Sequence, residues 1–303
     1  ELCRQQQALL RADLFIASDG PRVSAPRPTL FLGSRGAANF RLTIRARDNA
    51  YHSGNWGGLL SNPGIQLANA IASLVNARGV LQVEALKPDS LSAAVRAILS
   101  DIEVGGMPGD PALDADWGEP GLTAAERLYG WNTLEVLAFE TGNPARPMNA
   151  IPGEATAVCQ LRFVVGTDWE NLVAHVEAHL RAQGFDSVQV EFLRGSPATR
   201  LDPQSPLVAW ALESLAVSSG KKPALLPNLG GSLPNEVFSA ILGLPTLWVP
   251  HSYPACGQHG VNEHMLKSVA REGLQIMTRL FWQLGEEGEA LLARQQAYQG
   301  ARV

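Results

Sequence analysis

Residues 245–264 decide the fold, and they read PTLWV followed by PHSYPACGQHGVNEH. The first five residues are mostly apolar, which predicts a buried strand of a parallel sheet. The loop that follows holds three of the six histidines, and Asn262 with Glu263 predicts the start of a long helix over 263–284. Because α/β sheets hold ligands beyond the carboxyl ends of their strands, a histidine of this loop is a candidate metal ligand. The alternative is a loop histidine that bonds only to nearby backbone.

The segments outside this stretch extend the α/β pattern. Residues 206–219 predict a helix that ends before Gly220, and a second helix is expected over 234–242, after the turn LGGSLP. Near the N-terminal end, residues 13–18 predict a short buried strand that Asp19 follows directly. A carboxylate at this position suits a metal ion, although an Asp before Gly is more often a turn former. We predict an α/β domain with a doubly wound sheet, made of residues 1–34 and 198–303.

A second pattern lies between these two parts, over residues 35–197. Alternation of apolar and polar residues predicts strands, and apolar residues at helical spacing predict helices that include 62–78, where Asn62 and Pro63 resemble an N-cap and a first-turn proline. The strands are expected over 37–47, 133–139, 155–165 and 188–192, and the other helices over 91–100, 123–129 and 168–183. Without the extra segment 89–130, the order β-α-β-β-α-β is that of an inserted α+β ferredoxin-like domain.

Composition limits the classes of function. The chain has 24 Lys+Arg against 29 Asp+Glu, a formal charge of −5, and contains no basic run, which argues against a nucleic-acid or anionic-membrane partner. No apolar run approaches the ~18 residues that span a bilayer. The three cysteines are far apart and form no Cys-x-x-Cys, which favours a reducing, cytoplasmic compartment over a disulfide scaffold.

Six short motifs, taken together, resemble one family. In chain order they are Ser18-Asp19, Gly33-Ser34-Arg35-Gly36, His52-Ser53-Gly54 with Gly57-Gly58, Asn149-x-Ile151-Pro152, Gly230-Gly231-Ser232-x-Pro234, and Gly257-Gln258-His259 with Asn262-Glu263. None is specific alone, but their order around an inserted domain resembles the di-zinc metallopeptidase family of carnosinase, cytosolic nonspecific dipeptidase, glutamate carboxypeptidase and aminoacylase. The resemblance covers about residues 13–285, and the loop at His52 resembles the dipeptidase branch most.

The resemblance implies a role for eight residues. Asp19 and His259 would each bind one of two zinc ions, and His52 would reach the partner subunit's active site to stabilise the oxyanion. Arg162 would hold the substrate carboxylate, a task that suits a planar bidentate donor. Without the resemblance, Arg162 reads as a solvated surface charge. Substrate contacts are also implied for Asn149, Gly230, Gly231 and Ser232, where the last three could equally form a turn and a helix cap.

One departure from the family pattern matters most. The family requires a His-x-Asp pair, a bridging Asp and a Glu-Glu pair ahead of the Ser-Asp strand, yet no histidine precedes His52 here. We expect the N-terminal part of the catalytic domain to be missing, so that the chain holds an incomplete two-zinc site and is inactive alone.

The resemblance therefore implies a metal-dependent exopeptidase that hydrolyses dipeptides or related small amides. Two alternatives remain open at this point, an aminoacylase-type amidohydrolase acting on N-acyl amino acids and a non-catalytic remnant that dimerises. A homodimer is expected in either case, formed by the inserted domain through an edge strand at 37–47 and the helix 62–78.

Overall fold

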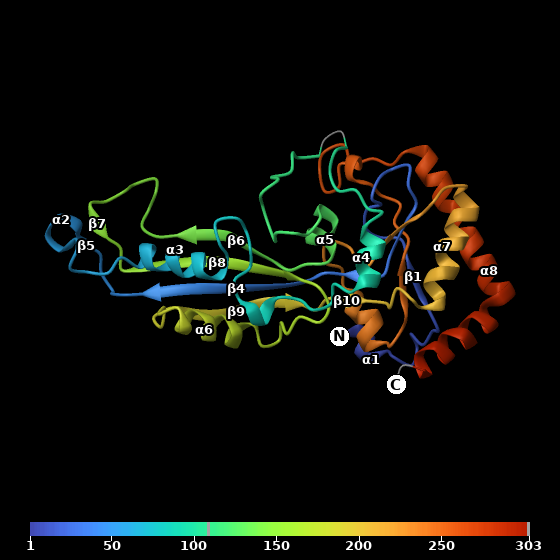
Figure 1. The fold of residues 1–303 in the computed structure, drawn as a ribbon, viewed down its shortest axis with the longest axis horizontal. Coiled ribbons are helices and arrows are strands. Elements are labelled where there is room, and N and C mark those ends of the chain that lie inside the picture. Colours follow the sequence, from blue (N-terminus) through green and yellow to red (C-terminus); the bar gives the residue numbers. More distant parts are fainter. Residues whose placement is uncertain (108–109, 302–303) are drawn as a thin grey trace.

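The computed structural model describes residues 1–107 and 110–301. The molecule is elongated and has two lobes, which we call the α/β lobe and the lid lobe (Figure 1). The short antiparallel pair β3 (Gly33–Ser34) and β10 (Thr199–Arg200) lies where the chain passes from one lobe to the other and back. The N-terminal helix α1 (Leu2–Gln5) belongs to the α/β lobe.

The α/β lobe is built on a four-stranded sheet in the order β1-β12-β2-β11. The strands are β1 (Phe15–Ala17), β12 (Thr246–Trp248), β2 (Thr29–Phe31) and β11 (Ala224–Leu226). β12 runs parallel to β1, and β11 parallel to β2, but β12 and β2 are antiparallel through one residue pair, Trp248 and Phe31. The predicted α/β fold is confirmed, with a mixed sheet in place of the expected parallel one.

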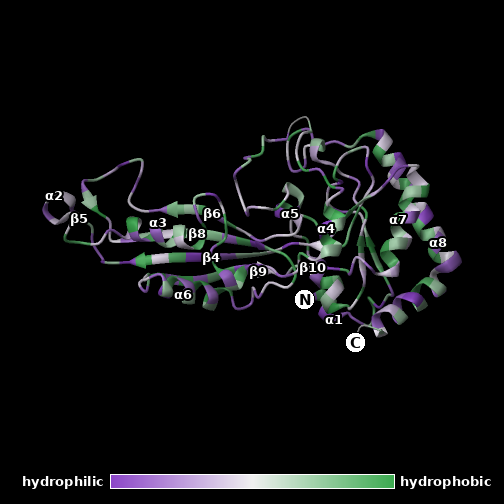
Figure 2. Ribbon diagram, in the orientation of Figure 1, coloured by the Kyte–Doolittle hydropathy of each residue, from purple (hydrophilic) through white to green (hydrophobic). Residues whose placement is uncertain are grey.

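Two long helices cover this sheet. α7 (Pro206–Ser219) and α8 (Lys267–Gly300) bury leucines and isoleucines against Leu30 and Leu247 of the sheet, among them Leu207, Leu215, Ile276, Leu280 and Leu291. Figure 2 shows hydrophobic and hydrophilic residues interleaved along both helices, as expected for helices with one buried face. No helix within the described ranges has the length and apolar character needed to cross a membrane.

The lid lobe has the predicted ferredoxin-like topology. Its antiparallel sheet has the order β6-β8-β4-β9, with β4 (Gly36–Arg45), β6 (Thr133–Glu140), β8 (Glu154–Phe163) and β9 (Gln189–Ser196). Helices α3 (Pro63–Leu74) and α6 (Leu172–Ala182) cover one face, where alternate residues of the two central strands are buried, such as Phe40, Leu42, Cys159 and Leu161. The opposite face carries the intervening polar residues, which include Asn39, Thr43, Gln160 and Arg162.

The predicted edge strand over 37–47 is wrong, because β4 is a central strand. It pairs with β8 over its whole length and with β9 over residues 37–43. Alternation of apolar and polar residues predicts which face of β4 is buried, but it does not predict which strands lie on either side of β4 in the sheet. The edges of the lid sheet are β6 and β9.

Helix ends were predicted well where a local cap decides them. Asn62 caps α3 by accepting from the backbone N–H groups of Gly64 and Ile65. Asn262 does not cap α8: it has φ 65°, and the helix begins only at Lys267. α8 also continues to Gly300, so the tail after Gly285 is helical. The helix predicted over 234–242 is present over 235–241, where two α-helical residues lead into a five-residue π-helix, η2 (Val237–Ile241).

The remaining elements are short. Between α3 and β6 lie η1 (Glu84–Leu86), α4 (Ala93–Leu99) and α5 (Ala124–Tyr129), and η3 (Pro254–Cys256) precedes His259. At the outer end of the lid lobe, β5 (Tyr51–His52) pairs with β7 (Ala150–Ile151), beside the single-turn helix α2 (Ser53–Trp56) (Figure 1). We call these three elements the tip.

Candidate functional site

The two predicted metal-ligand loops lie side by side. Pro21 forms a β-bridge with Ser252, and the Arg22 N–H donates to the Ser252 carbonyl at 2.8 Å. The Ser252 hydroxyl donates to the Gly20 carbonyl at 2.8 Å and accepts from Gln258 Nε2 at 2.9 Å. Hydrogen bonds through Ser252 thus connect the residue that follows Asp19 to the residue that precedes His259.

These loops do not by themselves fit a zinc ion. Asp19 and His259 are both exposed, and among the described residues the Asp19 carboxylate accepts only from the Gly20 N–H, at 2.7 Å. In the part of the chain that the structure describes, no three His, Cys, Asp or Glu residues gather closely enough to hold a metal. A catalytic zinc site uses about three protein ligands, so two candidates alone are too few.

The loop's other histidines are not placed as ligands. Both ring nitrogens of His251 are buried, neither has a hydrogen-bond partner within residues 1–107 and 110–301, and the ring lies against Gly273 of α8. Burial, with the nearby Arg22 charge, lowers the pKa of His251. His264 is exposed, and its Nδ1 lies 3.0 Å from the Asn262 carbonyl. His251 is therefore a neutral, packed side chain.

A buried ion network, which no motif in the sequence predicts, supports the same loops. Arg22 is 1% exposed and bonds to Glu272 of α8 at 2.5 Å and to the Pro250 carbonyl at 3.0 Å. Lys221 forms a second ion pair with Glu272. Burial alone would raise the pKa of Glu272, but the hydrogen bonds from Lys221 and Arg22 outweigh it, so the pKa lies below its usual value. A single Arg after Asp-Gly-Pro gives no sequence signal for this role.

Arg162 and Ser232, predicted as substrate-binding residues, meet at the junction of the lobes. Arg162 lies on the polar face of β8, and its Nη1 donates to the Ser232 hydroxyl at 2.9 Å. That hydroxyl donates in turn to the Arg35 carbonyl at 2.8 Å. Gly230 and Gly231 directly precede Ser232, so the predicted glycine turn lies beside Arg162. Arg162 is half-buried and hydrogen-bonded, which differs from a solvated surface charge.

Arg35 forms the buried base of this junction. It is 4% exposed, and its guanidinium donates to the carbonyls of Leu128 and Arg162 and to the Thr133 hydroxyl, each at 3.1 Å. Burial and the Arg162 charge lower the pKa of Arg35 to about 10. Neither arginine has a carboxylate within ion-pair distance among the described residues, although the charge of Glu135 acts on Arg35. The junction therefore carries excess positive charge.

His52 and Asn149 come together at the tip, far from the junction. The Ser53 N–H donates to the Asn149 carbonyl at 2.9 Å, and His52 Nδ1 accepts from the Gly54 N–H at 3.1 Å. Arg162 pairs with Ala37 at the start of β4, and the tip follows its far end (Figure 1). Ten residues of β4 at ~3.3 Å each extend about 30 Å. His52 therefore cannot reach the junction of its own subunit.

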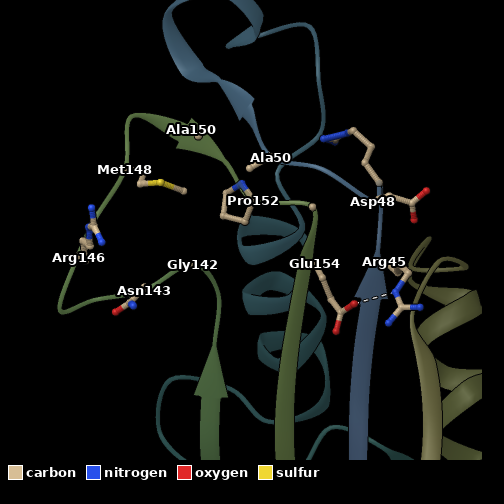
Figure 3. Close-up of a pocket in the computed structure, with 12 residues that line it drawn as sticks. Arg45, Asp48, Ala50, Gly142, Asn143, Arg146, Met148, Ala150, Pro152 and Glu154 are labelled. Carbon is tan, nitrogen blue, oxygen red and sulfur yellow. Dashed lines mark hydrogen bonds and ion pairs between the residues drawn. The ribbon is translucent and has the colours of Figure 1, made fainter.

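A cavity of about 440 Å³ lies at the same end of the lid, beside the tip. Its polar lining is mainly Arg45, Arg47, Asp48, Arg146 and Glu154 (Figure 3). Arg45 is paired with Glu154 at 2.7 Å, and Arg47 bonds to Ser61. The first contact joins the ends of β4 and β8, and the second links the segment before β5 to the segment after α2.

The sequence of this chain is similar to those of known peptidases. A family model for a peptidase dimerisation domain, that of the M20 peptidases, matches residues 32–187, just over half of the chain. The chain belongs to the M20 peptidase family. Among curated M20 proteins, it is 32% identical to human Beta-Ala-His dipeptidase over 287 residues, covering 90% of this chain and 56% of that one. It is 23% identical to the Cys-Gly metallodipeptidase DUG1 of Saccharomyces cerevisiae, with coverages of 91% and 60%.

Solved M20 structures share the fold. An M20 metallo-carboxypeptidase from Sulfolobus solfataricus has a TM-score of 0.73 and 22% identity, over 92% of this chain and 65% of that one. The dipeptidase Dug1p from Saccharomyces cerevisiae has a TM-score of 0.71 and 22% identity, over 92% and 60%. The chain spans about 58% of the length of the curated M20 relatives that it matches.

Proposed function

We propose that this M20 chain holds the substrate, and forms the dimer, of a metal-dependent exopeptidase that hydrolyses dipeptides or related small amides. The observation that carries the proposal is the hydrogen bond from Arg162 to Ser232, which joins the lid to the glycine turn in a junction with excess positive charge. Curated relatives of the chain are named as dipeptidases, which supports the substrate class.

In this proposal the junction binds the carboxyl end of a dipeptide. Arg162 supplies charge-assisted hydrogen bonds to the carboxylate, and the backbone N–H groups near Gly230 and Gly231 are available to the scissile carbonyl. His52 serves the other subunit, where its imidazole stabilises the oxyanion, and Asn149 contacts the substrate beside it. The length of the lid supports this assignment, because His52 is about 30 Å from its own junction.

The dimer would form along β6, one edge of the lid sheet. Val136, Leu137 and Phe139 of this strand are large apolar side chains that are 43%, 52% and 43% exposed. An exposed apolar edge strand is a ready surface for pairing with another chain. The matching family model is that of a dimerisation domain, so a second copy of this chain is the partner that we propose.

Zinc is the metal that we propose for the complete site. It would supply a nucleophilic water at neutral pH, and Asp19 and His259 would each contribute one ligand. The described residues do not provide a third, so further ligands must come from outside them.

One observation favours the non-catalytic alternative. Without a third ligand among the residues that the structure describes, a dimer that binds peptides but does not cleave them also fits the chain. Fusion of this chain to the N-terminal segment of a complete M20 dipeptidase separates the two, because with zinc only the exopeptidase then releases histidine from β-alanyl-histidine.

The proposal is tested by titrating β-alanyl-histidine into the purified protein and measuring the dissociation constant. Arg162→Ala should weaken binding roughly tenfold or more, because a charged hydrogen-bond partner is lost. Arg181→Ala, at an exposed arginine of α6, is the matched control and should leave binding unchanged. Equal affinities for all three proteins would contradict the proposal.

A further inference from the structure

Three side chains on the polar face of the lid sheet form a hydrogen-bonded row that ends at Arg162. Arg162 Nε donates to Gln160 Oε1 at 2.8 Å, and Gln160 Nε2 donates to Asn39 Oδ1 at 2.8 Å. Gln160 and Asn39 lie directly opposite each other on β8 and β4. Asn39 is 7% exposed, so the row begins at a buried anchor and ends at the junction of the lobes.

The positive charge of the Arg162 guanidinium determines which group donates in every hydrogen bond of this row. A guanidinium can only donate, so Gln160 must turn its oxygen toward Arg162 and its NH₂ group toward Asn39. Asn39 must then present its oxygen to Gln160. At the other end, the Ser232 hydroxyl accepts from Arg162 Nη1 and therefore directs its proton to the Arg35 carbonyl. One orientation of Gln160, and one of the guanidinium, satisfies all of these contacts.

This orientation leaves one edge of the guanidinium free. Nε is occupied by Gln160, and one N–H of Nη1 by Ser232. Nη2 has no hydrogen-bond partner in the described parts of the chain, and it is not one of the fully buried polar atoms that lack a partner. An arginine can grip a carboxylate through two parallel N–H groups, and the Nε–Nη2 edge is unavailable here. The remaining two-donor edge is Nη1–Nη2, which a ligand carboxylate can meet when Ser232 accepts from the Nη1 N–H on the Cδ side.

We propose that Gln160, held by Asn39, is a positioning residue that directs the substrate carboxylate to the Nη1–Nη2 edge of Arg162. This inference rests on the proposed function, in which Arg162 meets that carboxylate. Without Gln160 the guanidinium turns about its side chain and offers Nε as well, so the carboxylate loses its fixed position. Dipeptide binding should then weaken roughly tenfold, the usual effect of losing a hydrogen bond to a charged group.

The first test is spectroscopic and needs neither metal nor catalysis. In the ¹⁵N-labelled protein, the Arg162 Nε–H should give a resolved NMR signal, because it is hydrogen-bonded. Gln160→Met, which keeps the side-chain size but lacks the acceptor, should lose that signal. Gln160→Glu keeps the acceptor and should retain it. Loss in both variants, or retention in both, would overturn the inference.

The second test is a titration with glycylglycine. Gln160→Met should weaken binding roughly tenfold, whereas Thr156→Val should not. The control is matched because Thr156 also makes one cross-strand hydrogen bond on this face, to Thr43 at 3.1 Å. If Arg162→Ala binds as tightly as the wild type, the proposed function itself fails. If Arg162→Ala weakens binding but Gln160→Met does not, only the positioning role fails.

Discussion

Arg162 of the lid sheet and Ser232 of the α/β lobe are joined by a 2.9 Å hydrogen bond from Nη1 to Oγ. The residues are 70 positions apart in the chain, and the bond crosses the junction between the lobes. The bond therefore fixes the position of Arg162, which we propose binds the substrate, relative to the glycine turn before Ser232.

Ser232→Ala should lower the free energy of unfolding by about 2 kcal/mol, because a hydrogen bond to a charged group and one to a carbonyl are lost together. Urea unfolding measures this change. Ser218→Ala, which removes only a hydroxyl bond to the Ser214 carbonyl within α7, should stay within about 0.5 kcal/mol of the wild type. Similar values for the two variants would count against the junction as a stabilising contact.

Leu137→Lys should convert the proposed dimer to monomers. Leu137 is 52% exposed on β6, and a charge at the centre of a paired edge would have to be desolvated. Light scattering at micromolar concentration reports the mass directly. Val217→Lys, at an apolar residue of α7 that is 57% exposed, should remain a dimer. A wild-type monomer, or a dimer that survives Leu137→Lys, would exclude β6 as the interface.

Acid should destabilise the protein partly through Glu272. Its pKa is lower in the folded state than in the unfolded chain, where it is ~4.3. The ionised carboxylate therefore contributes stability above the unfolded pKa, and this contribution is lost as the pH falls through the folded pKa. Glu272→Gln should be less stable at pH 7, with a weaker loss of stability below about pH 4.5. Parallel stability–pH curves for the two proteins would contradict this role.

The 303-residue chain should bind zinc weakly and hydrolyse no dipeptide by itself. Two candidate ligands, Asp19 and His259, cannot complete two metal centres that each require about three. Isothermal calorimetry with zinc chloride tests the binding, and an assay with β-alanyl-histidine tests the activity. Two tight sites would require ligands other than those identified, and His251 would then have to leave its packed position against α8.

The sequence predicted what local chemistry controls. Asn62 and Pro63 identified the start of α3, and alternation identified the buried face of β4 and β8. It did not predict that β4 is central, because strand order depends on contacts that are distant in the chain. The helix start predicted at Asn262 was wrong for a related reason. The Asn262 side chain suits an N-cap, but the loop places its backbone in the left-handed region, at φ 65°.

In the candidate site, too, some features could be predicted from the sequence and others depend on contacts between distant residues. The family resemblance supplied Arg162, Ser232 and His52, but not the ion pair of Arg22 with Glu272, whose partners are 250 positions apart. The row from Asn39 through Gln160 could have been inferred in part, because alternation assigns both residues to the polar face. Their pairing, however, required the register of β4 against β8.

In the dimer that we propose, each substrate site combines the junction of one subunit with the tip of its partner. A mixed dimer tests this arrangement, after Cys3→Ser removes the one cysteine that is not buried. One subunit carries a nitroxide on His52→Cys, and the other is ¹⁵N-labelled and observed at Arg162 Nε–H. We predict strong paramagnetic broadening of that signal, reversed on reduction of the nitroxide. An unbroadened Arg162 signal in a confirmed mixed dimer would contradict the account.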